Sequence, residues 1–293
     1  MSALLDIRDL DLTLEGRVRL LRRVSLQVDA GRIVGLVGES GAGKTMVSRT
    51  VLGIAPANAR VTHGSVTFGG RDITRLAEDE RRHILGREIA FIPQNPMTAL
   101  NPVERIEPQI TDVLRMHLGM DRAASKARAL ELLDDVHLRE PARVLRAYPH
   151  ELSGGQRQRV LIAIAFACRP KLVIADEPTT ALDVTVQKQI LRLIRDLQSR
   201  SGTAILFITH DLGVVAKLCE DVVVMHGGRI LEAASAAQLF ARPAHEYTRA
   251  LFAATPRFDR PGDLLQPVPA ALTESLNSET LLLDRDSLRD QEA

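Results

Sequence analysis

The sequence has 293 residues, and 45% of them are apolar, so it can bury a sizeable core in one large α/β domain with elaborations or in two small domains. Its 38 basic and 37 acidic residues leave a formal net charge of +1, and aromatic residues make up only 3%. Neither bulk attraction to nucleic acid or an anionic membrane nor a base-stacking surface is therefore indicated.

The cysteines and the N-terminus bear on the compartment. Cys168 and Cys219 are far apart and lack metal-binding spacing, which predicts buried thiols in a reducing compartment. The first residues, MSALLDIRDLD, lack the apolar core of a signal peptide. The longest apolar run, 160–168, is too short for a membrane span of about 20 residues. We expect a cytoplasmic protein that docks onto a spanning partner if it works at a membrane.

The first part of the chain predicts mainly strands. Residues 4–14 alternate apolar and polar, the period of a half-buried strand. The run 24–28 and the nearly all-apolar run 32–38 predict two more, the second buried on both faces. Glycines end that strand, and a helix is expected to begin near Thr45. The stretch 61–73 predicts a strand pair with glycine-rich turns.

The middle of the chain changes character. Prolines punctuate residues 95–150, where polar helices such as 123–136 indicate an inserted helical subdomain, which we place at about 95–165. Strands and helices then alternate, which predicts a mainly parallel sheet with helices on both faces. The expected elements are strand 171–176, helix 186–200, strand 203–210, helix 211–219 and hairpin 221–232, with Gly227 and Gly228 at its turn.

The end of the chain differs in composition. From residue 257 on, prolines and glycines come first, and acidic residues then outnumber basic ones. We expect 257–293 to be a peripheral, partly disordered C-terminal extension, and 1–256 to form the main domain.

Residues 38–45, GESGAGKT, match the phosphate-loop pattern G-x-x-x-x-G-K-[ST] between a predicted strand and a predicted helix. Gly41 and Gly43 let successive backbone N–H groups converge on phosphate oxygens, and the helix presents its positive end there. Lys44 is expected to reach the β and γ phosphates, and the Thr45 hydroxyl to ligate Mg²⁺. The other loop residues expected to line the nucleotide are Gly38, Glu39, Ser40 and Ala42.

Residues 171–177, KLVIADE, form an apolar strand that ends in two carboxylates. They come at the strand edge where open α/β sheets bind ligands. Asp176 can hold Mg²⁺ through a water, and Glu177 can orient and polarise the attacking water. A solvated Asp-Glu pair at a strand end is the alternative, which the phosphate loop disfavours.

Residues 152–156, LSGGQ, come just before the apolar run 160–168, which suits a buried helix. Glycine costs about 1 kcal/mol relative to alanine inside a helix, so two glycines at its start need a reason. One reason is backbone amides left open for an anion. The other is close packing against a neighbouring helix.

With these motifs, the sequence resembles the ATP-binding subunits of ABC transporters over roughly residues 4–256. LSGGQ is the signature of that family. Gln94 in FIPQN, ALD at 181–183 and His210 in ITHD resemble its Q-loop, D-loop and switch histidine. The resemblance implies an α/β fold: a P-loop NTPase core with a mainly parallel sheet, an N-terminal antiparallel β subdomain and an inserted helical subdomain.

The resemblance also implies roles for these residues, with ATP and Mg²⁺ as cofactors. Gln94 would sense Mg²⁺ and water and couple the site to the helical insert, which looks like the docking surface for a membrane partner. His210 would contact the γ-phosphate and hold the water with Glu177, and the alternative is a histidine satisfied at a strand end. Asp183 would shape a contact between subunits. The signature residues that would contact an ATP held by a second subunit are Ser153, Gly154, Gly155 and Gln156.

A narrower resemblance points to the peptide/nickel importer group. It is carried by QNPMTALNPV at 94–103 and RPAHEYTRALFAATP at 242–256. It implies an importer ATPase peripheral to the cytoplasmic face of the membrane, with a second, different ATPase subunit, two membrane permeases and an extracytoplasmic substrate-binding protein. No nucleic-acid partner is expected.

Two features depart from that group. No cysteine follows Cys219, so we expect no iron–sulfur cluster. No aromatic residue stands near 12–19 to stack on adenine, and Leu14 or Arg17 would have to cover the base.

Four alternatives remain open. They are an importer ATPase for nickel or another small solute, a soluble ABC ATPase in DNA repair or translation, an exporter ATPase, and a cassette that binds ATP without turnover. The balanced charge, the single cassette and the short spacing from Lys44 to Ser153 argue against the second. The intact Glu177, His210 and signature argue against the last.

Overall fold

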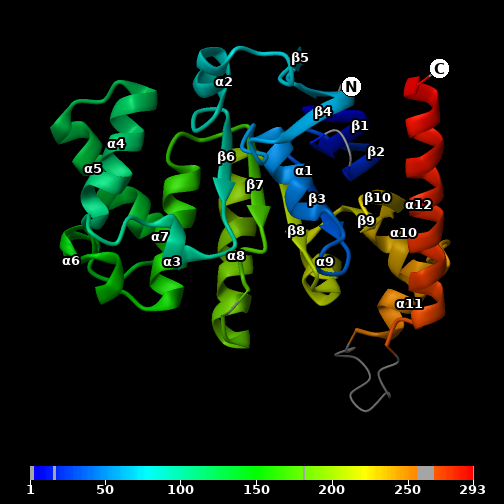
Figure 1. The fold of residues 1–293 in the computed structure, drawn as a ribbon. Coiled ribbons are helices and arrows are strands. Elements are labelled where there is room, and N and C mark those ends of the chain that lie inside the picture. Colours follow the sequence, from blue (N-terminus) through cyan, green and yellow to red (C-terminus); the bar gives the residue numbers. More distant parts are fainter. Residues whose placement is uncertain (1–2, 16–17, 181, 256–266, 293) are drawn as a thin grey trace. The chain divides into compact units, whose positions relative to one another are not determined.

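The computed structural model describes residues 3–15, 18–180, 182–255 and 267–292 (Figure 1). The chain forms two compact units. The first unit comprises Met1–Val28, Ile33–Arg75 and Ile208–Ala293. The second comprises Asp29–Arg32 and Leu76–Phe207. The chain thus leaves the first unit after Arg75 and returns to it within a strand.

The first unit contains an antiparallel four-stranded sheet in the order β2-β1-β4-β5. The predicted strand at 4–14 and the predicted pair at 61–73 are confirmed. The strand predicted at 24–28 begins earlier than expected, at Val18. The four strands are β1 Leu5–Leu14, β2 Val18–Val28, β4 Ala59–Phe68 and β5 Arg71–Asp72.

The first unit also holds the strand that leads into the phosphate loop. This strand, β3 (Ile33–Val37), is buried along its whole length and pairs in parallel with β9 (Asp221–His226). β9 and β10 (Arg229–Ser235) form the predicted hairpin. Its turn has φ +55° and +77° at Gly227 and Gly228, which glycine adopts without strain.

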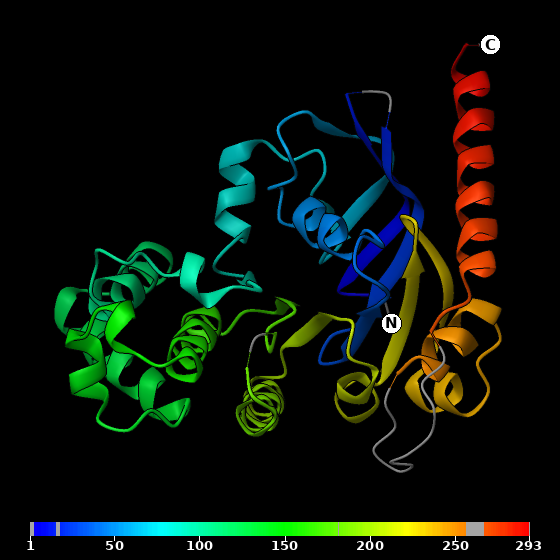
Figure 2. The ribbon, with the colours of Figure 1, turned by 60° about the horizontal axis from the view of Figure 1, so that its bottom comes forward.

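Five helices of the first unit are described. The last, α12, lies beside β2, where Asp284 accepts hydrogen bonds from Arg22 at 2.8 and 2.6 Å (Figure 2). Its Leu276 and Thr280 are buried. Residues 257–266 of the expected extension lie outside the described residues. The helices are α1 Lys44–Val51, α9 Leu212–Leu218, α10 Ala236–Ala241, α11 Glu246–Ala253 and α12 Ala270–Glu292.

The second unit has its own strands, β6 (Ile89–Ile92), β7 (Leu172–Asp176) and β8 (Ala204–Thr209), in the order β6-β7-β8. The last two residues of β8 belong to the first unit. β6 and β7 pair in parallel. The sequence predicted β7, β8 and the long helix α8 (Val184–Ser201), but it did not predict β6.

Helices dominate the rest of the second unit. α4 packs against α5 and α6, and α4 and α5 also pack against α7 (Figure 1). The predicted helix at 123–136 is α5, capped by Asp121. Among the described residues, no helix is long and apolar enough to cross a membrane. The elements are α2 Glu78–Ile84, α3 Pro96–Ala99, α4 Ile106–Leu118, α5 Arg122–Asp135, α6 Pro141–Arg146, the 3₁₀ turn Pro149–Glu151 and α7 Gly154–Phe166.

Candidate functional site

The predicted phosphate loop connects β3 to α1 in the first unit. A side chain at Gly38 would collide with the carbonyl oxygen of Met225, so this position requires glycine. Gly41 has φ +83°, which L side chains rarely adopt. The backbone of the loop therefore depends on the glycines that the sequence pattern singled out.

Lys44 and Thr45 begin α1, with Gly43 at the N-cap. No side chain caps this helix, and the positive end of a helix attracts an anion. Lys44 is only 5% exposed, and its Nζ donates to the carbonyl oxygens of Gly38 and Glu39, both at 2.8 Å. An ammonium group held inside the loop by two neutral acceptors can exchange them for phosphate oxygens. The loop therefore fits a nucleotide phosphate.

Glu39 has partners that the sequence did not indicate. The buried Tyr247 hydroxyl donates to Oε2 of Glu39 at 3.1 Å, and Nδ1 of His226 lies 3.9 Å from the same oxygen. Tyr247 is 208 positions away, so no local spacing could have identified it. The presence of a tyrosine in the closing motif at 242–256 was the only available signal.

In the second unit, β6 and β7 bring Gln94 next to Glu177. The two strands run in parallel, so the residues that follow them lie at the same sheet edge. Nε2 of Gln94 donates to Oε2 of Glu177 at 2.8 Å, and Oγ1 of Thr180 donates to the same oxygen at 2.9 Å. This arrangement holds a carboxylate in one orientation, as the positioning of a water molecule requires.

The backbone of Glu177 is strained, because φ +47° costs a non-glycine residue on the order of 1–3 kcal/mol. Asp176 precedes it at the buried end of β7 and is 4% exposed. The Asp176 carboxylate and the Gln94 amide oxygen are the kind of oxygen ligand that Mg²⁺ prefers. Since the Gln94 nitrogen bonds Glu177, its oxygen is the atom left for a cation.

Mg²⁺ at a nucleotide needs only one or two protein oxygens, because phosphates and water complete its shell. In the part of the chain that the structure describes, no cluster of three or more His, Cys, Asp or Glu side chains could hold a metal ion by itself. The donor set predicted from the sequence fits a nucleotide-bound cation better than a free-standing metal centre.

The signature lies at the start of α7, as predicted. Ser153 is the N-cap: its Oγ accepts from the Gln156 amide at 3.3 Å, while Oε1 of Gln156 accepts from the Ser153 amide at 2.9 Å. A Cβ at Gly155 would lie 2.9 Å from Cγ1 of Val186, whereas a Cβ at Gly154 would meet nothing nearer than 3.8 Å. Close packing therefore accounts for Gly155 but not for the exposed Gly154.

Asp183 is the N-cap of α8. Its Oδ1 accepts from the amides of Thr185 and Val186 at 3.0 and 2.9 Å. It thus fixes the Val186 backbone, whose side chain lies against Gly155 of the signature. Ala181, the first residue of the predicted D-loop, lies outside the described residues.

His210 follows β8 in the first unit and is exposed. The next residue, Asp211, caps α9 by accepting from the amides of Gly213 and Val214 at 2.9 and 3.2 Å. The start of α9 thus fixes the backbone beside His210, and the imidazole is accessible to a ligand. The phosphate loop and His210 belong to the first unit, whereas Gln94, Asp176, Glu177 and the signature belong to the second.

Of the two residues expected to cover adenine, the structure describes only Leu14. Leu14 is the half-buried last residue of β1, opposite Val18 of β2. Arg17 lies outside the described residues. Recognition of the base by either residue stays a prediction.

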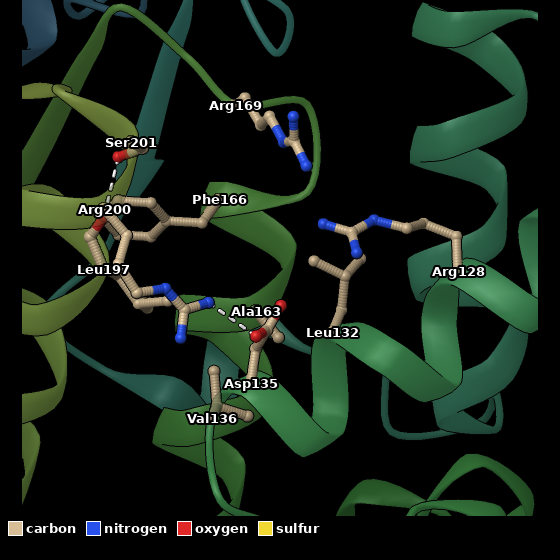
Figure 3. A pocket seen from close by; sticks show the side chains of 10 residues that line it. All are labelled: Arg128, Leu132, Asp135, Val136, Ala163, Phe166, Arg169, Leu197, Arg200 and Ser201. Atoms are coloured by element: carbon tan, nitrogen blue, oxygen red, sulfur yellow. Dashed lines mark hydrogen bonds and ion pairs between the residues drawn. The ribbon is translucent and has the colours of Figure 1, made fainter.

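A cavity of about 440 Å³ in the second unit lies among α5, α7 and α8 (Figure 3). Side chains of Arg128 and Arg200 line it, and Arg200 pairs with Asp135 at 2.6 Å. Ala163 in its wall is about 15 Å along α7 from Ser153. The residues that line the cavity include none of those predicted for the nucleotide, so its position does not support a role in ATP binding.

Comparisons with known proteins agree with the motifs. The family described as ABC transporter matches residues 21–180. A probable peptide ABC transporter ATP-binding protein of Sinorhizobium fredii is 50% identical over 257 residues, which cover 86% of this chain and 77% of that protein. The dipeptide transport ATP-binding protein of Escherichia coli is 44% identical over 254 residues, or 87% and 78% of the two chains. A dimeric ATP-binding cassette solved in a post-hydrolysis state with ADP and phosphate is 27% identical, with a TM-score of 0.71, and covers 79% of this chain and 98% of that chain.

Proposed function

This chain is an ATP-hydrolysing member of the ABC transporter family, and from that premise we propose that it drives a peptide importer from the cytoplasmic face of the cell membrane. The observation that carries the substrate class is the 50% identity to a probable peptide transporter's ATP-binding protein over 86% of the chain. We place the cassette at residues 1–256, with the helical insertion at about 95–165 and a C-terminal extension at 257–293.

Nucleotide binding is assigned to Gly38–Thr45. Amides at the start of α1 would donate to the phosphate oxygens, and Lys44 would exchange its two carbonyl partners for the β and γ phosphates. Thr45, Gln94 and Asp176 would hold Mg²⁺. Bound MgATP would supply the phosphoanhydride bond that is cleaved, and the cation would neutralise the negative charge of the phosphates.

Glu177 is assigned to the attacking water. The hydrogen bonds from Gln94 and Thr180 orient its carboxylate, which would in turn orient the water and accept its proton. The imidazole of His210 would contact the γ-phosphate and help to hold the same water. The strained backbone of Glu177 supports this role, because such strain concentrates at functional positions.

The signature is assigned to the ATP held by a second ATPase subunit. Ser153 and Gly154 are exposed at a helix N-terminus, and packing does not explain Gly154. Gly155 and Gln156 would complete this contact. In the assembly that we propose, the partner ATPase is a different chain, and two permeases and a substrate-binding protein complete the transporter.

The test is transport by the reassembled complex. The chain would be co-produced with the two permeases, the second ATPase and the binding protein that we propose as its partners, and the complex would be placed in liposomes. We expect ATP-dependent uptake of a labelled dipeptide that Lys44→Ala abolishes and Lys171→Ala, on the surface beside Glu88, leaves unchanged. Uptake of Ni²⁺ but not of dipeptide would contradict the substrate class, and ATPase activity stimulated by DNA without permeases would contradict the importer.

A further inference from the structure

Glu39 joins the phosphate loop to a part of the chain far away in sequence. Its carboxylate accepts a hydrogen bond from the Tyr247 hydroxyl at 3.1 Å, while its carbonyl oxygen accepts one from Nζ of Lys44 at 2.8 Å. One loop residue thus lies between a tyrosine of α11 and the lysine expected to bind phosphate.

Several contacts fix Tyr247 in place. Its side chain is fully buried, and its ring centroid lies 4.7 Å from that of His226. Glu232 of β10 anchors the start of α11 by accepting from the amides of Ala244 and His245 at 2.7 and 2.9 Å. Because the side chain is already fixed, the hydroxyl loses little conformational entropy when it donates to Glu39, and the hydrogen bond is more favourable.

The end of β9 supports the same part of the loop. The carbonyl of Met225 lies where a side chain at Gly38 would be, and the next residue, His226, approaches Glu39. On its other side, Nε2 of His226 lies 3.3 Å from Oδ1 of Asn277 in α12. The first two loop residues are thus held against β9 and α11.

The tyrosine is suited to be a permanent donor. Burial, and after it the charge of Glu39, raises the pKa of the Tyr247 hydroxyl, so the group keeps its proton at neutral pH. The ring alone would fill the same space without forming this bond. The hydroxyl is therefore the group whose role can be separated from packing.

We propose that Tyr247 is a positioning residue for ATP, whose hydroxyl holds the Glu39 carboxylate away from the phosphate-binding amides and from Lys44. A released carboxylate at this position would compete with phosphate for the same donors and would repel it. The inference rests on the proposed binding of ATP by Gly38–Thr45. The motif at 242–256 would then have a structural role in the nucleotide site.

The test uses the full chain in the assembled transporter. Tyr247→Phe keeps the ring and removes the hydroxyl, so we expect the KM for ATP to rise about ten-fold, while kcat at saturating ATP stays within about two-fold. Tyr148→Phe is the matched control, because Tyr148 is the only other tyrosine of the sequence and stacks on His150 in the second unit. It should leave the KM unchanged.

A double-mutant cycle separates the effect of the Tyr247–Glu39 hydrogen bond from the effect of packing. With Glu39→Ala no carboxylate is left to release, so adding Tyr247→Phe should change the KM by less than about two-fold. A ten-fold effect in both backgrounds, or an unchanged KM for Tyr247→Phe alone, would overturn the inference. Lys44→Ala tests the underlying assignment separately: wild-type ATP binding by that variant would contradict ATP binding by the loop itself.

Discussion

At the scale of single residues, both the backbone and the side chain of Glu177 are constrained. Its φ of +47° is unfavourable, and two donors, Gln94 and Thr180, share one of its carboxylate oxygens. A solvated carboxylate at a strand end would need neither feature. Both features support the catalytic role that we propose for Glu177.

Glu177→Gln is expected to keep ATP bound but to lower turnover by at least about ten-fold, since an amide can accept the same hydrogen bonds but cannot take a proton from water. Phosphate release by the assembled complex measures turnover, and a nucleotide-binding titration measures affinity. A wild-type rate would exclude the role that we assign to Glu177.

The two glycines of the signature should behave differently. Gly155→Ala pushes a methyl group against Val186 and should lower the free energy of unfolding by about 1–3 kcal/mol, whereas Gly154→Ala has room and should not. Gly154→Ala should still lower ATPase activity, because its methyl group would stand beside amides that, in our proposal, face the partner's ATP. Urea unfolding and ATPase assays separate the two effects, and full activity of Gly154→Ala would argue against open amides there.

At the scale of elements, the sequence predicted the strands whose residue pattern is simple. β3 and β7 are nearly continuous apolar runs, and apolar and polar residues largely alternate along β1. The alternation did not predict the burial of β1, because Asp6, Asp11 and Thr13 are buried together with the apolar residues. The first half of β2 was missed because VRLLRR looks too polar. Its charged residues have partners outside the strand: Arg19 pairs with Asp11 of β1, and Arg22 pairs with Asp284, 262 positions away.

Other misses have different causes. β6 has only four residues, too few for a period to show, although its end positions Gln94. The contact between Glu39 and Tyr247 joins residues that are 208 positions apart, which periodicity cannot reveal. Motifs within one short stretch, such as the phosphate loop and the signature, could be placed on their elements from the sequence alone.

Truncation after residue 269 tests the role of α12 as an element. Asp284 and the buried Leu276 hold it to the first unit, so its loss should lower the free energy of unfolding by about 1–3 kcal/mol. ATPase activity should remain within about two-fold, because Tyr247 and Glu232 lie before the cut. Leu276→Ala should destabilise the protein while Leu282→Ala, at an exposed position, should not. An inactive truncation would contradict a peripheral extension.

At the scale of the whole molecule, the predicted site residues are divided between the two units. The first unit carries the phosphate loop and His210, and the second carries Gln94, Glu177 and the signature. The sequence did not predict this division. The helical insertion predicted at about 95–165 contains the signature but not Gln94 or Glu177, whereas the second unit extends from Leu76 to Phe207. If the signature serves the ATP of another subunit, a change in it must act on a second chain.

Ser153→Arg provides the corresponding test. An arginine at the exposed start of α7 should block access of the partner's ATP to this signature. ATP bound at this chain's own phosphate loop would still meet the partner's signature and would be hydrolysed there. In the assembled complex, vanadate trapping of a radioactive photoreactive ATP analogue labels each ATPase subunit separately. We expect labelling of the partner to fall by at least about ten-fold, with this chain still labelled. Ser199→Arg, on the exposed surface of α8, is the control for the added charge and should label both chains. Loss of label from this chain alone would mean that the signature serves its own loop, and the two-chain clamp would have to be abandoned.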